Sequence, residues 1–300
     1  MVNIGSWVSA ARLRTLPLSI SGIIVGTTIA AQQGYFNIAV FSLALGTTLG
    51  LQILSNFAND YGDGVKGTDN EDRVGPARAL QSGLISRREM KQGIVITALV
   101  TLILALLLIY TAFGGENFLY AIIFFLLGLG AIAAAIKYTV GNNAYGYRGM
   151  GDIFVFLFFG LVAVFGSYFL YAMQLDWKVF LPAAAIGFLS AGVLNLNNMR
   201  DRASDQKAGK NTLVVLLGEE NAKNYHYALI IAAVLFMVIY SVLTAAEWND
   251  ILYVIAFIPL FLHLKRVVQN ENPMLLDPEL KILALTTFLL SVLFAAGLFF

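Results

Sequence analysis

Two short polar segments interrupt a chain that is otherwise strongly apolar, and each follows a long apolar run. The first, NDYGDGVKGTD, covers residues 59–69, and the second, NLNNMRDRASDQKAGK, covers residues 195–210. The pattern Asn-x-x-x-Asp occurs in both, as Asn59 with Asp63 and as Asn197 with Asp201. Side chains four residues apart share one face of a helix, so each segment presents an amide and a carboxylate side by side. Their oxygen atoms are the hard ligands that Mg²⁺ prefers.

More acids and several bases lie within or next to the same two segments. We predict a metal site formed by Asn59, Asp63, Asp69, Asn197, Asp201 and Asp205. Magnesium in proteins is typically held by one or two carboxylates together with phosphate oxygens of a substrate. The bases available to hold those phosphate oxygens are Lys66, Arg73, Arg78, Arg200 and Lys210. Acids for a metal beside bases for phosphates predict a Mg²⁺-dependent diphosphate site, in which Mn²⁺ could replace Mg²⁺.

A simpler interpretation is that these residues cap helices and form turns. Asp, Asn and Gly are common at helix ends, and Lys and Arg near a membrane often only set its orientation. Asp60 and Asp72 fit the capping role best. The occurrence of one pattern twice, with bases beside each copy, favours a binding site for the other acids.

The composition indicates that a membrane protein carries these segments. Of the 300 residues, 59% are hydrophobic and 12% are charged, whereas soluble domains contain about 25% charged residues. Several apolar runs approach the length at which a helix crosses the hydrocarbon core. We predict an all-α membrane protein, with residues 1–300 forming one polytopic domain. Its nine transmembrane helices are expected at residues 16–33, 37–58, 92–113, 117–137, 152–172, 178–199, 224–244, 249–265 (interrupted by Pro259) and 281–299.

The distribution of basic residues predicts how this bundle is oriented. Every Lys and Arg except Lys178 falls on one side of the nine-span topology. The positive-inside rule then places the N-terminus and both polar segments in the cytoplasm. The formal net charge of +1 gives no indication of nucleic-acid binding, and we expect no nucleic-acid partner.

A cation transporter is an alternative function, because acids in transmembrane segments also mark ion pathways. A transporter would place its acids near the middle of the bilayer, often in broken helices. Here the acids cluster at the ends of the predicted spans, among Lys and Arg. This arrangement favours the diphosphate site.

The two polar segments resemble the aspartate-rich motifs of intramembrane aromatic prenyltransferases of the UbiA superfamily. The similar stretches are NDYGDGVKGTDNEDRVGPARALQSG and NNMRDRASDQKAGKNTLVVLLG. The resemblance is greatest to the branch that prenylates 1,4-dihydroxy-2-naphthoate, through RLRTLP at 12–17 and YGYRGMGDIFVFLFFG at 145–160. Two departures stand out. Gly67 occupies the usual third acidic position, so that Asp69 supplies the acid, and Asp152 stands where Glu is expected.

The resemblance implies a UbiA-type helical bundle in the cell (inner) membrane, with a cavity open to the cytoplasmic side. It implies transfer of a polyprenyl chain from polyprenyl diphosphate to 1,4-dihydroxy-2-naphthoate, with loss of CO₂ and diphosphate, in menaquinone biosynthesis. Sister enzymes use 4-hydroxybenzoate or homogentisate, and these acceptors remain alternatives. The residues expected to act in catalysis are Asp63, Asp201, Lys66 and Tyr138. The residues expected to bind the acceptor are Lys137, Tyr145, Arg148 and Asp152.

Overall fold

The computed structural model describes residues 3–69 and 74–299, and their regular structure is helical apart from an isolated bridge between Arg148 and Asn211. The long helices are α2 (Leu16–Gln32), α3 (Ile38–Lys66), α4 (Arg87–Phe113), α5 (Phe118–Lys137), α8 (Phe180–Lys207), α9 (Leu213–Leu243) and α11 (Leu276–Phe299). The shorter helices are α1 (Ile4–Ala11), α6 (Gly151–Val155), α7 (Ala163–Ala172) and α10 (Phe257–Val268). The all-α prediction is confirmed.

Within the described residues, eight helical segments are long and apolar enough to cross a membrane. They match eight of the nine predicted spans. The remaining prediction, 249–265, corresponds to the 3-10 turn Leu252–Ala256 followed by α10, which make a shorter segment. Pro259 lies in the first turn of α10, where its missing N–H costs no helical hydrogen bond. The proline therefore marks the beginning of this helix and does not interrupt it.

Two helices extend well beyond their predicted ends, and these extensions carry the polar segments. Helix α3 continues from the predicted end at 58 to Lys66, where Gly67 takes a left-handed conformation (φ 75°) and closes the helix. Helix α8 continues from 199 to Lys207. Both Asn-x-x-x-Asp pairs are therefore helical, and in each pair the amide and the carboxylate share one face.

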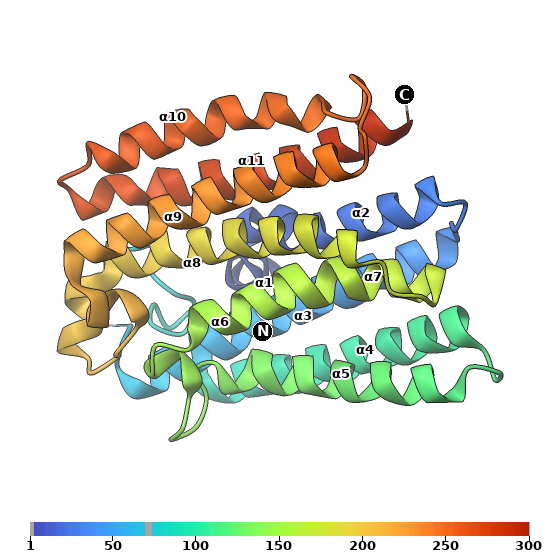
Figure 1. Cartoon of the computed structure of the whole chain (residues 1–300). Helices are drawn as coiled ribbons and strands as arrows, with labels where there is room; N and C mark the ends of the chain where they lie inside the picture. Colours follow the sequence, from blue (N-terminus) through green and yellow to red (C-terminus); the bar gives the residue numbers. More distant parts are fainter. Residues whose placement is uncertain (1–2, 70–73, 300) are drawn as a thin grey trace.

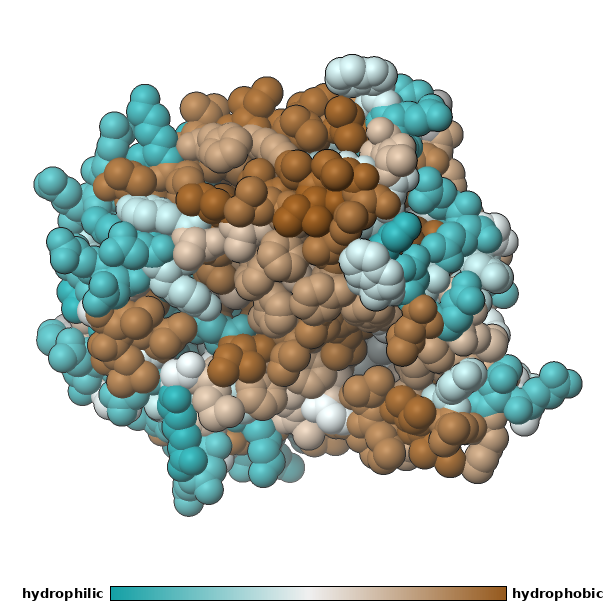
Figure 2. All heavy atoms as spheres, viewed as in Figure 1, coloured by the Kyte–Doolittle hydropathy of each residue, from teal (hydrophilic) through white to brown (hydrophobic). Residues whose placement is uncertain are grey.

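The helices form an antiparallel bundle in which chain segments distant in sequence meet at one end. Figure 1 shows the α3–α4, α5–α6, α8–α9 and α10–α11 connections together at the left-hand end. These connections and the helix ends that they join carry the two polar segments and most of the basic residues. The surface in Figure 2 has a broad brown apolar zone between two teal polar ends, as expected of a protein that crosses a bilayer.

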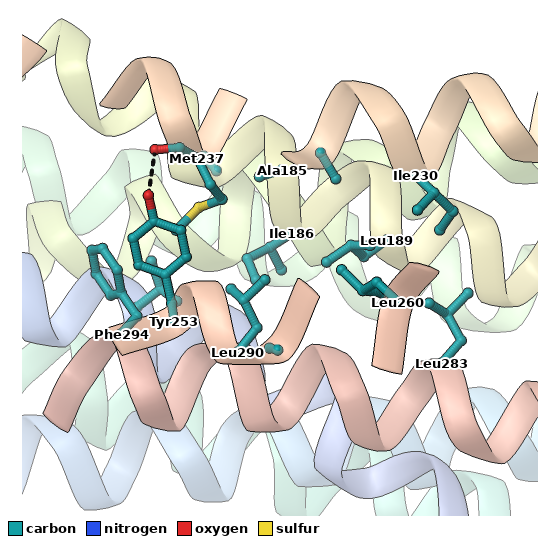
Figure 3. Close-up of a cluster of buried hydrophobic side chains, with 14 of the residues drawn as sticks. Ala185, Ile186, Leu189, Ile230, Met237, Tyr253, Leu260, Leu283, Leu290 and Phe294 are labelled. Atoms are coloured by element: carbon teal, nitrogen blue, oxygen red, sulfur yellow. Dashed lines mark hydrogen bonds between the residues drawn. The ribbon is translucent and has the colours of Figure 1, made fainter. Parts of the chain in front are cut away.

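Helix α8 is the most buried of the spanning segments, with 78% of its most apolar window inside the protein. Figure 3 shows Ile186 and Leu189 of α8 packed against Leu283 and Leu290 of α11. The Tyr253 hydroxyl donates to the Met237 carbonyl at 3.0 Å, which satisfies a polar group inside this apolar cluster. The tight packing fixes α8, and with it the second polar segment.

A π-helical segment, Phe156–Val162, joins α6 to α7 and packs against α8. A Cβ added to Gly160 would lie 2.6 Å from the Ala183 carbonyl oxygen, so only glycine allows this approach. Single π turns often occur at functional sites because they redirect the side chains that follow them. Here the segment places Phe158, Phe159 and Val162 on the wall of the cavity described next.

Candidate active site

A cavity of about 380 Å³ connects the polar end of the bundle with its apolar interior. Its polar end is lined by Asn59, Asp63, Asn197 and Lys210. Along α3 the lining extends back to Ala44, which at 1.5 Å per residue is about 28 Å from Asp63. Farther from the polar end, the walls are mainly apolar side chains, including Leu108, Ile109, Phe124, Leu127 and Leu170. One cavity thus offers a charged head region and a long apolar region.

Asp63 is the centre of the polar end. Its Oδ1 accepts a hydrogen bond from the Tyr147 hydroxyl at 2.8 Å, and its Oδ2 lies 3.4 Å from Lys210 Nζ. Lys210 Nζ also lies 3.7 Å from Asp205 Oδ1, so one ammonium bridges a carboxylate from each polar segment. The two segments therefore meet in space, as the sequence predicted.

Lys66 points toward the loop that follows α5. Its Nζ donates to the Thr139 carbonyl at 2.8 Å and lies 3.9 Å from the centre of the Tyr147 ring. The Thr139 hydroxyl donates to the Ala58 carbonyl at 2.9 Å, which fastens this loop to α3. Lys66 is thus beside the Asp63 cluster, although it does not line the cavity among the described residues.

Arg200 is enclosed by oxygen acceptors. Its Nε and Nη2 donate to the two carboxylate oxygens of Asp201 at 2.8 and 2.6 Å, and Nη2 also donates to Asn197 Oδ1 at 3.0 Å. Its Nη1 donates to Asp277 at the start of α11. The arginine side chain is fully buried, and this geometry suits it to hold Asn197 and Asp201 in place.

The predicted metal ligands are only partly gathered around the cavity. Asn59, Asp63 and Asn197 line it, whereas Asp201 pairs with Arg200 and Asp205 faces Lys210. Asp69 is buried just after α3. Over the described residues, no three acidic, histidine or cysteine side chains form a ready-made metal cluster.

Two of the remaining predicted diphosphate and capping residues, Arg78 and Asp60, lie in the described part of the chain. Arg78 lines the cavity, and Arg73 and Asp72 lie outside the described residues. Asp60 accepts hydrogen bonds from the backbone N–H groups of Ala79 and Leu80 at 3.1 and 3.3 Å. Asp60 therefore caps the turn after Arg78, in agreement with its predicted structural role.

A row of aromatic rings covers one wall of the cavity. Tyr138 and Tyr145 meet edge to face at 5.3 Å, Tyr145 stacks on Phe154 at 4.0 Å, and Phe154 stacks on Phe158 at 6.2 Å. All four rings line the cavity. The turn that aligns them needs Gly146, because a Cβ there would lie 2.7 Å from the Tyr138 carbonyl oxygen. Aromatic faces stabilise cations by cation–π attraction.

Tyr145 is the one predicted acceptor-binding residue that lines the cavity among the described residues. Lys137 and Arg148 are exposed on the surface, and Arg148 donates to Asn143 Oδ1 at 2.5 Å. Asp152 is buried, with 3% of its surface exposed, and its carboxylate is near the Tyr225 hydroxyl. The loop before α6 therefore contributes Tyr145 to the site, whereas Lys137, Arg148 and Asp152 do not line the cavity among the described residues.

Charges and burial fix the protonation of groups at the polar end. Burial lowers the pKa of Lys210, but attraction by Asp63 and Asp205 outweighs it and holds that pKa above its ordinary value. Burial, followed by the Asp63 carboxylate, raises the pKa of Tyr147. Burial and the carboxylates of Asp152 and Asp63 raise the pKa of Tyr138 well above its ordinary range. At neutral pH Lys210 is a cation and both phenols are neutral.

Three basic residues on the cavity wall were not among the predicted site residues. They are Arg12, Arg14 and Lys281. The RLRTLP motif, which the sequence analysis quoted only for its family resemblance, contains two of them. Lys281 gave no signal in the sequence, because a base at the end of a predicted span is expected from topology alone.

The family comparison agrees with this geometry. The model of the UbiA prenyltransferase family matches residues 19–274. The chain is 43% identical over 295 residues to 1,4-dihydroxy-2-naphthoate octaprenyltransferase of Haemophilus influenzae, covering 97% of this chain and 95% of the relative. It is also 43% identical to the Escherichia coli protein of that name, covering 98% and 95%. The chain belongs to the UbiA prenyltransferase family.

Solved structures show the same fold. A UbiA homologue from Archaeoglobus fulgidus superposes with a TM-score of 0.68 at 19% identity, over 98% of both chains. The homologue from that organism bound to GPP and Mg²⁺ superposes with a TM-score of 0.62 at 19% identity, over 96% of this chain and 98% of the other. The prediction of a UbiA-type helical bundle is confirmed.

Proposed function

We propose that this protein transfers a polyprenyl group from a polyprenyl diphosphate to 1,4-dihydroxy-2-naphthoate in menaquinone biosynthesis. The observation that carries the proposal is the single cavity that joins a charged end at Asp63 and Lys210 to a long apolar region. The identity of 43% with two enzymes named for this acceptor, over nearly the whole chain, supports the choice of acceptor. A transporter does not fit, since the chain belongs to a family of prenyltransferases.

The polar end fits a divalent cation that is shared with a diphosphate. Asn59, Asp63 and Asn197 supply one carboxylate and two amide oxygens to the cavity. Asp205 is linked to Asp63 through Lys210, Asp201 is linked to Asn197 through Arg200, and Asp69 is buried just after α3. These carboxylates already attract positive charge, since the Lys210 ammonium lies within 4 Å of both Asp63 and Asp205. So small a protein ligand set suits Mg²⁺, whose coordination the substrate's phosphate oxygens complete. When bound, Mg²⁺, or Mn²⁺ in its place, neutralises negative charge on the diphosphate.

The basic residues contribute to diphosphate binding in different ways. Lys210 and Arg78 line the cavity, where they contact the diphosphate, and Lys66 adds positive charge beside the Asp63 cluster. Arg73 keeps the diphosphate-binding role expected from the sequence. Arg200 contributes through Asn197 and Asp201, whose side chains it holds. Stabilising charge on the departing diphosphate is the main electrostatic task of such a site.

The aromatic wall is suited to the cation that forms when the allylic C–O bond breaks. Tyr138, Tyr145, Phe154 and Phe158 line the cavity beside the head region and exclude water from it. The acceptor ring then forms a C–C bond through its carboxylated carbon, and loss of CO₂ restores aromaticity. No strong protein base is required, because CO₂ leaves in place of a proton.

The protein is a multi-pass membrane protein, and we propose that its polar end faces the cytoplasm of a bacterial inner membrane. The chemistry of both substrates requires the polar end to face water, because the charged head groups enter from water while the polyprenyl tail stays in the apolar zone. The bases at the polar end agree with the positive-inside rule.

The test is an in vitro assay with purified protein, a set of polyprenyl diphosphates and candidate acceptors. We expect 1,4-dihydroxy-2-naphthoate to be prenylated with release of one CO₂ per product, measured by product mass and trapped CO₂. Preference for 4-hydroxybenzoate or homogentisate would reassign the protein to a sister activity. No transfer to any aromatic acceptor would refute the proposed function.

A further inference from the structure

Four ionisable side chains form a network outside the cavity, between helices that Figure 1 shows side by side. They are His226 of α9, His263 and Arg266 of α10, and Glu279 of α11, and we call them the histidine network. His226, His263 and Glu279 are buried, and none of the four lines the cavity among the described residues. Any effect on the reaction must therefore reach the cavity through their neighbours.

The hydrogen bonds of the network fix the positions of its protons. Arg266 donates to both carboxylate oxygens of Glu279. His263 Nδ1 lies 2.6 Å from Glu279 Oε2 and carries the proton that it donates. A neutral His263 then presents Nε2 as an acceptor, so His226 Nε2, 3.0 Å away, carries a proton as well. Directional bonds thus run from α11 through α10 to α9.

The network also reaches α8, the helix that carries the second polar segment. The His226 ring packs beside Gly192, where an added Cβ would lie 3.6 Å from Cε1 of the ring and 3.3 Å from Leu283 of α11. About one turn farther along α8, Asn195 Nδ2 donates to the Ala222 carbonyl of α9 at 3.1 Å. These contacts hold α8 where the second polar segment begins.

Glu279 shares the first turns of α11 with Asp277, and the two acids contact different helices. Residues two apart on a helix point in nearly opposite directions. Asp277 accepts from Arg200 Nη1 of α8 and lies 3.5 Å from Arg14 Nη1. Pro278 between the two acids has a fixed φ, which stiffens the turn that joins them. A displacement of Glu279 is therefore transmitted to Asp277.

Stability alone does not explain a polar network at this place. Replacing buried polar and ionic groups by apolar side chains of similar volume is often neutral or stabilising. His226 Nδ1 is buried and has no protein hydrogen-bond partner among the described residues, which adds an unfavourable term. Directional bonds, in contrast, hold the helices in one arrangement.

We propose that His263 and Glu279 are positioning residues for the active site, and this inference rests on the proposed function. Through the first turns of α11 they hold Asp277 against Arg200, which in turn holds Asn197. Asn197 lines the polar end of the cavity, where the divalent cation binds with the diphosphate. Outer-shell partners of metal ligands change metal affinity by about 10- to 100-fold, and an effect transmitted through a helix belongs at the lower end.

The experiment measures Mn²⁺ binding in the presence of inorganic diphosphate, with free Mn²⁺ followed by electron paramagnetic resonance. The triple variant His226→Leu/His263→Leu/Glu279→Leu replaces the network by apolar side chains, and Arg266, 45% exposed, stays solvated. Its unfolding temperature should remain close to that of wild type. Its dissociation constant for Mn²⁺ should rise about tenfold. A folded triple variant with the wild-type dissociation constant would overturn the inference.

Glu279→Gln tests the same link with a smaller change, because it keeps the shape of the side chain and removes its charge. Charge-assisted hydrogen bonds are about twice as strong as neutral ones, so about half of the free-energy effect should be lost, which is about a threefold rise in the dissociation constant. An unchanged constant in this variant would also contradict the positioning role.

Asp277→Asn tests the route of the effect. This variant should weaken Mn²⁺ binding at least as much as the triple variant does. Combining Asp277→Asn with the triple variant should add little, because both act through the same contact with Arg200. Fully additive effects would show two independent routes and would exclude transmission through α11.

Tyr253→Phe is the matched control, because it removes buried hydrogen bonds at the opposite end of the same helices. The Tyr253 hydroxyl bonds with Ser241 Oγ at 2.6 Å and with the Met237 carbonyl at 3.0 Å. This variant should unfold at a lower temperature and keep the wild-type Mn²⁺ affinity. A loss of affinity as large as in the triple variant would show that any loosening of these helices suffices, and the inference would be wrong.

Prenyl transfer is measured in parallel, so that the proposed function and the inference fail in different ways. Wild-type protein that binds Mn²⁺ with diphosphate but transfers no prenyl group would refute the proposed function, and the affinities of the variants would still decide the inference. Wild-type protein that binds no Mn²⁺ with diphosphate would overturn the inference, because it has no metal site to position. Unchanged Mn²⁺ affinity in all the variants, with normal prenyl transfer, would overturn the inference alone.

Discussion

Replacing Asp201 by Asn should impair this protein in two ways, and the structure allows the two to be separated. Asp201 lies within a buried ion pair, with its carboxylate bonded twice to Arg200 at 2.8 and 2.6 Å. The Arg200 side chain is fully buried and that of Asp201 is 7% exposed. Removing one partner of such a pair leaves a buried charge uncompensated and costs about 3–5 kcal/mol. Asp277 still contacts Arg200, so we expect a loss of about 3 kcal/mol.

A loss of turnover in Asp201→Asn would therefore not by itself show that the carboxylate takes part in the reaction. The double variant Arg200→Met/Asp201→Leu removes both charges with little change of volume. Replacing a buried ion pair by apolar residues is often neutral or stabilising, so the double variant should regain most of the lost stability. Because it lacks the carboxylate and the contact to Asn197, its turnover should remain at least about 10²-fold below wild type.

The assay measures thermal unfolding in detergent together with turnover per folded protein. The control is the exposed pair Arg202 and Glu219 on the same side of the bundle, at 3.1 Å. Converting both to Gln should change the free energy of unfolding by no more than about 1 kcal/mol and leave turnover intact. A stable double variant of Arg200 and Asp201 with near-normal turnover would refute a role for Asp201 in the reaction and reduce it to a structural partner of Arg200.

Three other perturbations test the polar end. Tyr147→Phe removes the 2.8 Å hydrogen bond to Asp63 but keeps the ring beside Lys66, so turnover should fall about tenfold or more in steady-state assays with the protein still folded. The folded-state pKa of Lys210 is raised above its unfolded value. The stability that the Lys210 ammonium contributes is therefore complete below the unfolded pKa of about 10.4, and it is lost only as pH rises through the higher folded-state pKa. The difference in unfolding temperature between wild type and Lys210→Met should therefore be constant from about pH 6 to pH 9, and a decline within that window would contradict this assignment. Removing divalent metal with EDTA should abolish turnover and added Mg²⁺ should restore it, whereas full turnover of metal-free protein would exclude the proposed metal role.

The two histidines illustrate a structural feature that the sequence did not reveal. They lie outside the polar segments and 37 residues apart, so their positions in the sequence do not indicate that they meet. In the fold His226 Nε2 is 3.0 Å from His263 Nε2, and His263 Nδ1 is 2.6 Å from Glu279 Oε2, all of them buried. This series of hydrogen bonds ties α9, α10 and α11 together, and none of the three side chains lines the cavity. His226 is consequently a poor choice as a silent control in mutagenesis.

The sequence by itself determined the class of fold and the position of the charged site along the chain. Lipid offers no hydrogen bonds to the backbone, so a spanning segment must be a helix or part of a closed barrel, and uninterrupted apolar runs without alternation favour helices. The spacing of Asn59 with Asp63 and of Asn197 with Asp201 required only the local geometry of one helix. These features depend on neighbours in sequence, so they can be recognised without knowledge of the packing.

Tertiary structure alone decided which side chains share the cavity. Arg200 and Lys210 are both bases in the second polar segment, yet one is buried against Asp201 and Asp277 while the other bridges Asp63 and Asp205. Arg14 meets Asp277 at the beginning of α11, a contact between chain ends that no spacing rule can indicate. Contacts of this kind depend on how helices distant in sequence pack and on which partner satisfies each desolvated charge, and both are properties of the assembled bundle.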